Sequence, residues 1–133
     1  MARRYAILDD NDERLARRLY ALRKLLPPLI ASRACAAIVI GSVAEGRARD
    51  ASDIDVVIVL SDGEPRRDDY RWWDGEVVPG LDEQPDGRFP VQPVIIARAS
   101  VATDEPHLRT ALATGIPLWD PEQLFHDEPE ATA

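Results

Sequence analysis

The sequence predicts a single α/β domain, and two observations carry this prediction. Short runs rich in β-branched residues, such as Ile54 to Leu60, are typical of strands buried in a sheet. Stretches with apolar residues at helical spacing stand before and after these runs. The chain has 133 residues, of which 45% are hydrophobic, so it is large enough to bury a core. We therefore expect residues 1–133 to form one domain, a small sheet with helices packed on it.

The first predicted helix covers residues Asp12 to Leu26. Acidic residues stand at its start and Arg23-Lys24 near its end, which suits the helix dipole. Its apolar positions recur at helical spacing: Leu15, Leu19, Leu22 and Leu26. Pro27-Pro28 follows directly, and proline disrupts helix interiors, so we expect the helix to stop there.

Three runs are predicted as strands: Ala36 to Ile40, Ile54 to Leu60 and Val91 to Ala97. The third contains Pro93, which has no backbone N–H to donate within a sheet. We therefore expect this strand at an edge of the sheet or at a bulge.

The segment from Ser61 to Pro90 is rich in Asp, Gly, Pro and Arg and holds few apolar residues. We predict a long excursion there, with room for a short hairpin. Its paired Trp72 and Trp73 are interpreted as packing anchors under the loop, and the stacking of a base on them is the alternative.

A second helix is predicted to begin at Thr103-Asp104-Glu105-Pro106, with the proline near the first helical position, and to end at Gly115. Its apolar stripe is Leu108, Ala111 and Leu112. We expect Trp119 in the core and residues 126–133 as a frayed acidic tail.

Composition excludes several classes of function. The formal net charge is −8 and Lys24 is the only lysine, so we expect no extended nucleic-acid surface and no P-loop. Cys35 is the only cysteine, which leaves no internal disulfide and no cysteine zinc site. No apolar stretch approaches the roughly 20 residues that span a bilayer, so we expect no membrane partner and a cytoplasmic protein.

Two small motifs flank the predicted strands between residues 36 and 60. Gly41-Ser42 follows the first strand, where a glycine lets the backbone approach an anion and a serine hydroxyl adds a donor. Asp53 and Asp55 are two residues apart at the start of the second strand and therefore face the same side. Two carboxylates so close resist joint ionisation unless a cation lies between them, and Mg²⁺ or Mn²⁺ prefers such oxygen ligands. A phosphate turn beside metal carboxylates indicates phosphoryl transfer.

The pattern G-S-x-A-x-G-x-A-x-x-x-S-D-I-D over residues 41–55 resembles the signature of the DNA polymerase β-like nucleotidyltransferases, in their minimal nucleotidyltransferase form. The resemblance implies a mixed sheet flanked by helices, with Gly41 and Ser42 holding a nucleoside triphosphate and Asp53 and Asp55 holding Mg²⁺ or Mn²⁺. Arg49 stands where the family often has an arginine that pairs with a phosphate, and a solvated loop arginine is the alternative.

The family activity is transfer of a nucleoside monophosphate from the triphosphate to a hydroxyl acceptor. Such minimal domains often act beside a helical HEPN-type protein in toxin–antitoxin pairs, so the resemblance implies a HEPN-type partner and the role of an antitoxin. A homo-oligomer is also left open.

The sequence departs from the family pattern at two positions. Gln92 stands where the family usually has a third metal-binding carboxylate, and Glu45 replaces the usual arginine after the turn. Acids of the preceding segment might substitute for the missing ligand, and these are Glu76, Asp82, Glu83 and Asp86. Two hypotheses follow, an active Mg²⁺-dependent enzyme and a weakened or inactive module that binds a nucleotide or a protein.

Overall fold

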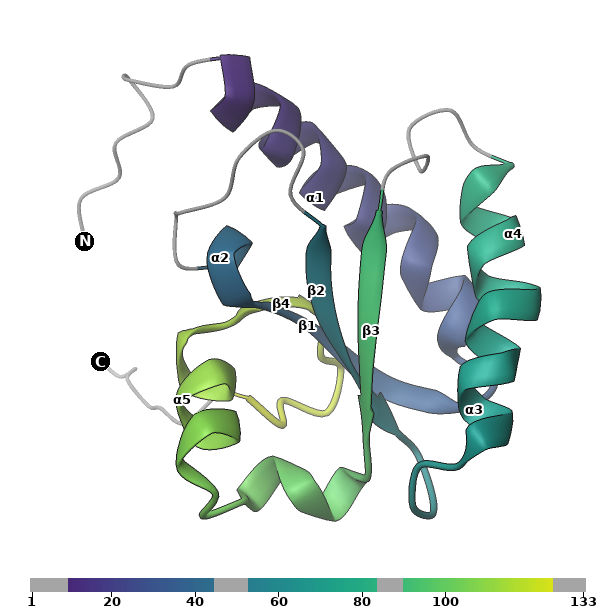
Figure 1. Ribbon diagram of the computed structural model, residues 1–133, viewed down its shortest axis with the longest axis vertical. Helices are drawn as coiled ribbons and strands as arrows, with labels where there is room; N and C mark the ends of the chain where they lie inside the picture. The colour runs from purple at the N-terminus through teal and green to yellow at the C-terminus, as the bar shows by residue number, and fades with distance from the viewer. Residues whose placement is uncertain (1–9, 45–52, 84–89, 126–133) are drawn as a thin grey trace.

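The computed structural model describes residues 10–44, 53–83 and 90–125, which form a four-stranded sheet with helices on both faces (Figure 1). The strands are β1 (Ala34–Ile40), β2 (Ile54–Leu60), β3 (Val91–Ile96) and β4 (Ile116–Trp119), in the order β3-β2-β1-β4. β1 pairs antiparallel with β2 and β4, and β2 pairs parallel with β3. The predicted mixed sheet flanked by helices is therefore confirmed.

One face of the sheet is covered by two helical segments. The first is α1 (Asp10–Ile30), and the second runs without a break through α3 (Arg67–Trp72), the π-helical turn η2 (Trp73–Val77) and α4 (Val78–Asp82). Leu22, Leu26 and Ile30 of α1 are fully buried against the sheet. This face holds the larger part of the core.

The prediction that the first helix stops at Pro27-Pro28 is wrong, because α1 contains both prolines and ends at Ile30. Proline has a helical φ, so its cost lies in lost N–H donors and in crowding of the preceding turn. The extra turn buries Ile30 completely, and Ala31 N–H still donates to the Pro27 carbonyl at 3.0 Å. Burial in the core therefore outweighs the local preference.

Residues 67–82 of the excursion between the second and third strands are helical, and no hairpin forms in the part of the excursion that the structure describes. Trp73, Val77 and Leu81 recur every four residues and are buried in one cluster. Trp72 is buried as well, with the Arg33 guanidinium 5.4 Å from its ring centroid. Arg33 also pairs with Asp68 and Asp69, which ties the start of α3 to the segment before β1.

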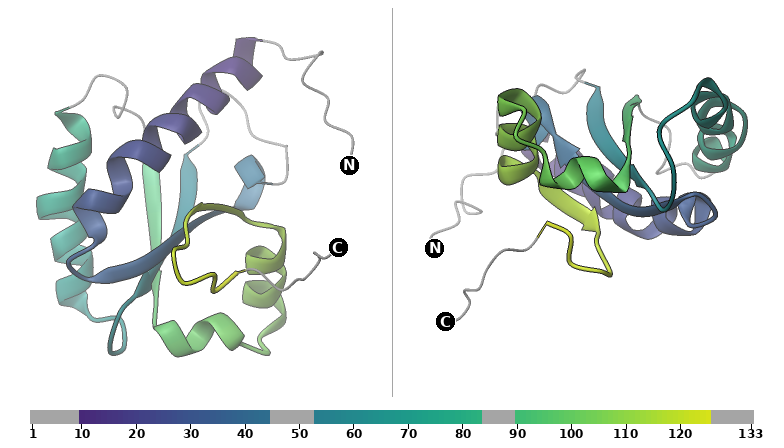
Figure 2. Two further views of the ribbon diagram at one scale, coloured as in Figure 1. Left: turned by 180° about the vertical axis from the view of Figure 1, so that it is seen from behind. Right: turned by 90° about the horizontal axis from the view of Figure 1, so that it is seen from below.

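The opposite face is covered only in part. The 3-10 helix η4 (Arg98–Ala102) and α5 (Pro106–Thr114) lie on this side, away from α1 (Figure 2). Leu112 of α5 packs with Cys35, Ile38, Val57 and Val59 in a second buried cluster. The predicted second helix is confirmed, since Glu105 caps its start by accepting from the N–H groups of His107 and Leu108, and Gly115 follows its end.

The two edges of the sheet are β3 and β4. β3 lies at an edge, as Pro93 predicted. β4 forms the other edge and was not predicted as a strand, although its half-buried Trp119 packs against the core as expected. No helix among the described residues has both the length and the apolarity needed to cross a bilayer.

Candidate functional site

Gly41 joins β1 to the short helix α2 (Gly41–Ala44) through a turn that suits glycine. Its φ is +76°, in the left-handed region that other residues rarely adopt. A Cβ atom placed on Gly41 would lie 2.8 Å from Asp55 Oδ2, closer than two such atoms can approach. The end of β1 is therefore in direct contact with the carboxylate at the start of β2.

Asp55 is the second residue of β2, and Asp53 precedes the strand by one residue. The Cα of Asp55 pairs with that of Ile40 on one side and with that of Gln92 on the other. Burial raises the pKa of the half-buried Asp55 carboxyl, and the negative charge of Asp53 raises it further. Asp53 itself is exposed. The two carboxylates thus act on each other electrostatically, as their spacing predicted.

This pair of carboxylates suits a divalent cation. A raised pKa means that the folded protein resists charge on Asp55, and a cation between the two aspartates would relieve that resistance. Carboxylate oxygens are the ligands that Mg²⁺ and Mn²⁺ prefer. Asp53 and Asp55 are therefore the described residues that could hold such an ion.

Gln92 occupies the position beside Asp55 on the neighbouring parallel strand, and its side chain is exposed. Residues paired in this way point to the same face of the sheet. Among the described residues, no three acids, histidines or cysteines gather in a group that could hold a metal. Glu76, Asp82 and Glu83 therefore do not join the two aspartates.

Several residues named from the sequence lie outside the described residues. These are Arg49, Glu45, Asp86 and the acidic tail of residues 126–133. Ser42 lies within α2, directly after Gly41, and is half-buried. The described part of the site therefore consists of Gly41, Ser42, Asp53 and Asp55, with Gln92 beside it.

Comparison with known families supports this interpretation of the site. The model of the nucleotidyltransferase domain matches residues 32–92, a range that contains the turn, both aspartates and Gln92. The matched range is a little under half of the chain. The resemblance inferred from the 41–55 pattern is thereby confirmed. A search of curated proteins finds no match to this chain.

Two solved structures are similar to this nucleotidyltransferase domain. A protein from Sulfolobus solfataricus that was assigned as a nucleotidyltransferase is 18% identical, with a TM-score of 0.52. The match covers 84% of this chain and 87% of that one, and it supports the fold. A toxin–antitoxin structure with AMP-PNP is 17% identical over 84% of this chain and 77% of that one, with a TM-score of 0.46.

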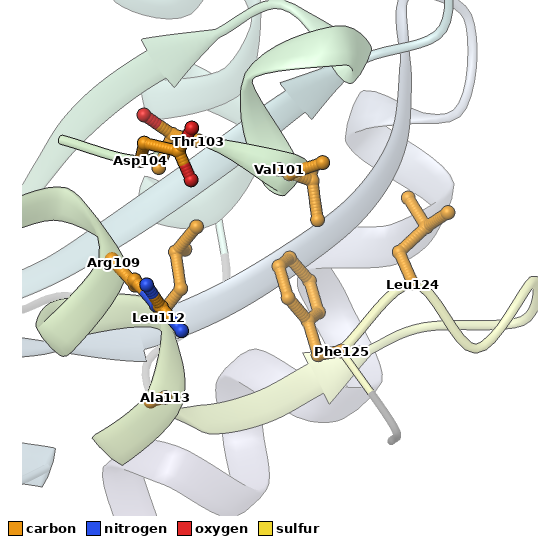
Figure 3. Close-up of a pocket in the computed structure, with 9 residues that line it drawn as sticks. Val101, Thr103, Asp104, Arg109, Leu112, Ala113, Leu124 and Phe125 are labelled. Carbon is orange, nitrogen blue, oxygen red and sulfur yellow. The ribbon is translucent and has the colours of Figure 1, made fainter.

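A hollow among the described residues lies apart from this site. It has a volume of about 320 Å³ and lies between η4, α5 and the segment at Leu124 and Phe125 (Figure 3). Its lining is mixed, with the polar side chains of Thr103, Asp104 and Arg109 beside apolar ones such as Leu112 and Phe125. None of the residues from the turn or from the start of β2 lines it. We assign the site by its pattern of reactive groups and not by cavity volume, because the hollow contains neither the glycine turn nor the pair of aspartates.

The two tryptophans of the excursion do not form part of the site. Trp72 is 4% exposed and Trp73 is 1% exposed, so neither ring offers a face on which a base can stack. Their interpretation as packing anchors is confirmed, although they anchor a helix and not a loop.

Proposed function

We propose that this chain is a metal-dependent enzyme that transfers a nucleoside monophosphate from a nucleoside triphosphate to a hydroxyl acceptor. The observation that carries the proposal is the contact between the turn at Gly41 and the carboxylate of Asp55, with Asp53 beside it. A turn open to phosphate and a carboxylate pair open to a cation lie within one small region. Nucleotidyl transfer needs both features together.

In this proposal each residue of the site has a separate task, and Arg49, outside the described residues, is included on the basis of the family resemblance. The backbone of Gly41 and the hydroxyl of Ser42 bind the triphosphate, and Arg49 pairs with one of its oxygens. Asp53 and Asp55 hold Mg²⁺ or Mn²⁺, which when bound lowers the pKa of the acceptor hydroxyl and neutralises phosphate charge. The acceptor oxygen forms a bond to the α-phosphorus and gives its proton to solvent water, while the bond from that phosphorus to the bridging oxygen breaks and pyrophosphate leaves.

A second candidate function is favoured by Gln92. Because the residue beside Asp55 is a neutral amide, a bound cation would have only the carboxylates of Asp53 and Asp55 among the described residues. Two carboxylates are enough to bind a metal–nucleotide complex, but they position and activate the acceptor hydroxyl less well than three. The alternative is therefore a nucleotidyltransferase-fold module that binds a nucleotide or a partner protein and turns over slowly or not at all.

We further propose a cytoplasmic antitoxin that acts beside a helical HEPN-type protein. This part rests on the resemblance of residues 41–55 to minimal nucleotidyltransferases, and on a triphosphate substrate, which is abundant inside cells. The acceptor hydroxyl would then belong to the partner, a small molecule or an RNA end.

The experiment follows label from an α-³²P nucleoside triphosphate into macromolecules of a host-cell extract, with Mg²⁺ present. We expect labelling by the wild-type chain and a loss of at least a hundredfold in Asp53→Asn/Asp55→Asn, because that variant loses both carboxylates. Separate measurement of nucleotide binding distinguishes the two candidates. Binding without labelling favours the module, and neither binding nor labelling contradicts both.

A further inference from the structure

Helix α1 is acidic in its first four residues, which include Asp10, Asp12 and Glu13, and carries only positive charge from residue 14 to its end. Between residues 14 and 33 every charged residue is basic, although the whole chain has 24 acidic and 16 basic residues. The left view of Figure 2 shows α1 crossing the front of the molecule, with the sheet behind it. Cations on its outer side therefore face solvent and form a surface that differs in charge from the rest of the protein.

Three exposed residues form a stripe along this outer side: Arg17, Tyr20 and Lys24. Their spacing of three and four residues places them on one face of the helix. Tyr20 is 64% exposed, the most exposed of the large hydrophobic residues described. The Lys24 ammonium lies 5.1 Å from the centroid of its ring, so the aromatic and cationic groups form one continuous surface.

We propose that the Arg17–Tyr20–Lys24 stripe is a docking surface for a protein partner with an acidic surface. Tyrosine and arginine are the residues that most often supply binding energy at protein interfaces. An aromatic ring at the centre of the stripe gives an apolar anchor, and cations at both ends select a negative partner. The core does not require the ring of Tyr20 in this position.

The charge distribution favours an acidic protein over a nucleic acid. The stripe spans seven residue steps, or about 10 Å of helix. A phosphate backbone extends further than this, and beyond the stripe it would meet a chain with a net charge of −8. An acidic patch on a folded protein is small enough to match the stripe alone.

Some backbone groups on both edges of the sheet are bonded or missing, which makes a helix face the better docking surface. On β3, Pro93 has no N–H, and the N–H of Ile95 donates to the Tyr70 hydroxyl at 3.2 Å. On β4, the carbonyl of Pro117 accepts from Arg23 Nη2 at 3.0 Å. Edge groups that are already bonded or missing cannot pair with an added strand. These edge groups favour a partner that binds through side-chain surfaces.

The stripe and the candidate site lie on opposite faces of the sheet. Asp55, Val57 and Val59 are two residues apart along β2 and therefore point to the same face of the sheet. Val57 and Val59 pack in the cluster under α5, whereas α1 covers the other face. A protein bound to the stripe would leave the start of β2 accessible. The proposal consequently does not depend on nucleotidyl transfer, and substitutions in the stripe should leave nucleotide binding unchanged.

The test titrates the isotopically labelled chain with a 20-residue helical peptide rich in Glu and Leu, and separately with a 20-nucleotide single-stranded RNA, while NMR records backbone amide shifts. We expect the peptide to shift the amides of residues 17–24. Arg17→Glu/Lys24→Glu should weaken peptide binding about tenfold, since two attractions become repulsions. Tyr20→Ala should weaken it several-fold without any change in charge.

The matched control is Arg67→Glu/Arg71→Glu, which makes the same change in net charge on α3. Both residues are exposed there, and we expect peptide binding to change less than twofold. Equal losses in the two double variants would show attraction by net charge alone and overturn the proposal. Shifts that avoid α1, or tighter binding of the RNA than of the peptide at the stripe, would also overturn it.

Discussion

Strands β2 and β3 run in the same direction and begin side by side, yet their first residues differ in charge. β2 begins next to two carboxylates, Asp53 and Asp55, while β3 places the neutral Gln92 beside Asp55. One strand therefore supplies every acid that the described residues bring to the candidate site. Binding of a metal–nucleotide complex needs mainly the first strand and the turn at Gly41, whereas acceptor activation draws on the second. The comparison predicts that binding and turnover respond to different substitutions.

The largest effect is expected for Gly41→Val. Its side chain would disrupt the close approach between the turn at Gly41 and Asp55 at the start of β2. The new side chain would require a left-handed backbone, at a cost of about 1–3 kcal/mol, and its Cβ would meet the Asp55 carboxylate. We expect nucleotide binding to be lost in isothermal titration calorimetry. Unchanged affinity would show that the turn only connects two elements.

Gly63→Val is the matched control for this substitution. Gly63 also has a positive φ, of 79°, but no atom lies within 4 Å of the position of its Cβ. The backbone strain is therefore similar, and the contact with Asp55 is unaffected. We expect a comparable loss of melting temperature with nucleotide affinity retained.

Gln92→Glu sharpens the comparison by giving β3 an acid beside Asp55. If the neutral amide limits turnover, transfer of α-labelled nucleotide should rise by at least about tenfold, the lower end of the effect of residues that support metal ligands. Nucleotide affinity should change little, because Asp53 and Asp55 already provide that binding. An active wild type that gains nothing from this change would place the missing ligand elsewhere, and alanine at Asp86, the candidate acid outside the described residues, would then test that residue.

The smallest effect concerns pH and the stability of the metal-free protein. The pKa of Asp55 is raised from the ordinary 3.8, so the folded state binds this proton more tightly than the unfolded state does. The stabilising contribution of the proton is present below pH 3.8 and is lost as pH rises through the raised pKa. Asp55→Asn should remove this dependence and be the more stable protein at neutral pH, as measured by urea unfolding. A variant less stable than the wild type at pH 7 would contradict this expectation.

The described site was predicted from the sequence better than the elements around it. Gly41, Asp53 and Asp55 stand at fixed spacing between two apolar runs, and such local patterns survive folding. Gln92 was named only through the family resemblance, which places a third carboxylate on this strand, and its pairing with Asp55 comes from the structure. The place of Arg49 stays a prediction, because it falls outside the described residues.

Elements that depend on tertiary contacts were predicted less well. β4 has only four residues and includes Pro117, so no strand pattern is visible in its sequence, and it forms by pairing with β1. The helical segment of residues 67–82 contains Gly75, Pro79 and Gly80, which conceal the four-residue spacing of its buried side chains. In both cases burial against the sheet decides the conformation, and local propensity does not reveal it.

The most direct test of the central claim, that Asp53 and Asp55 hold a cation together with a nucleoside triphosphate, is a thermal shift measurement. Wild type and Asp53→Asn/Asp55→Asn are melted with and without a Mg²⁺–nucleoside triphosphate complex. At a ligand concentration about 100 times the dissociation constant, the wild type should gain roughly 2.7 kcal/mol of stability, seen as a rise of several degrees. The double variant should gain far less. Equal shifts in the two proteins would remove the cation site from these residues.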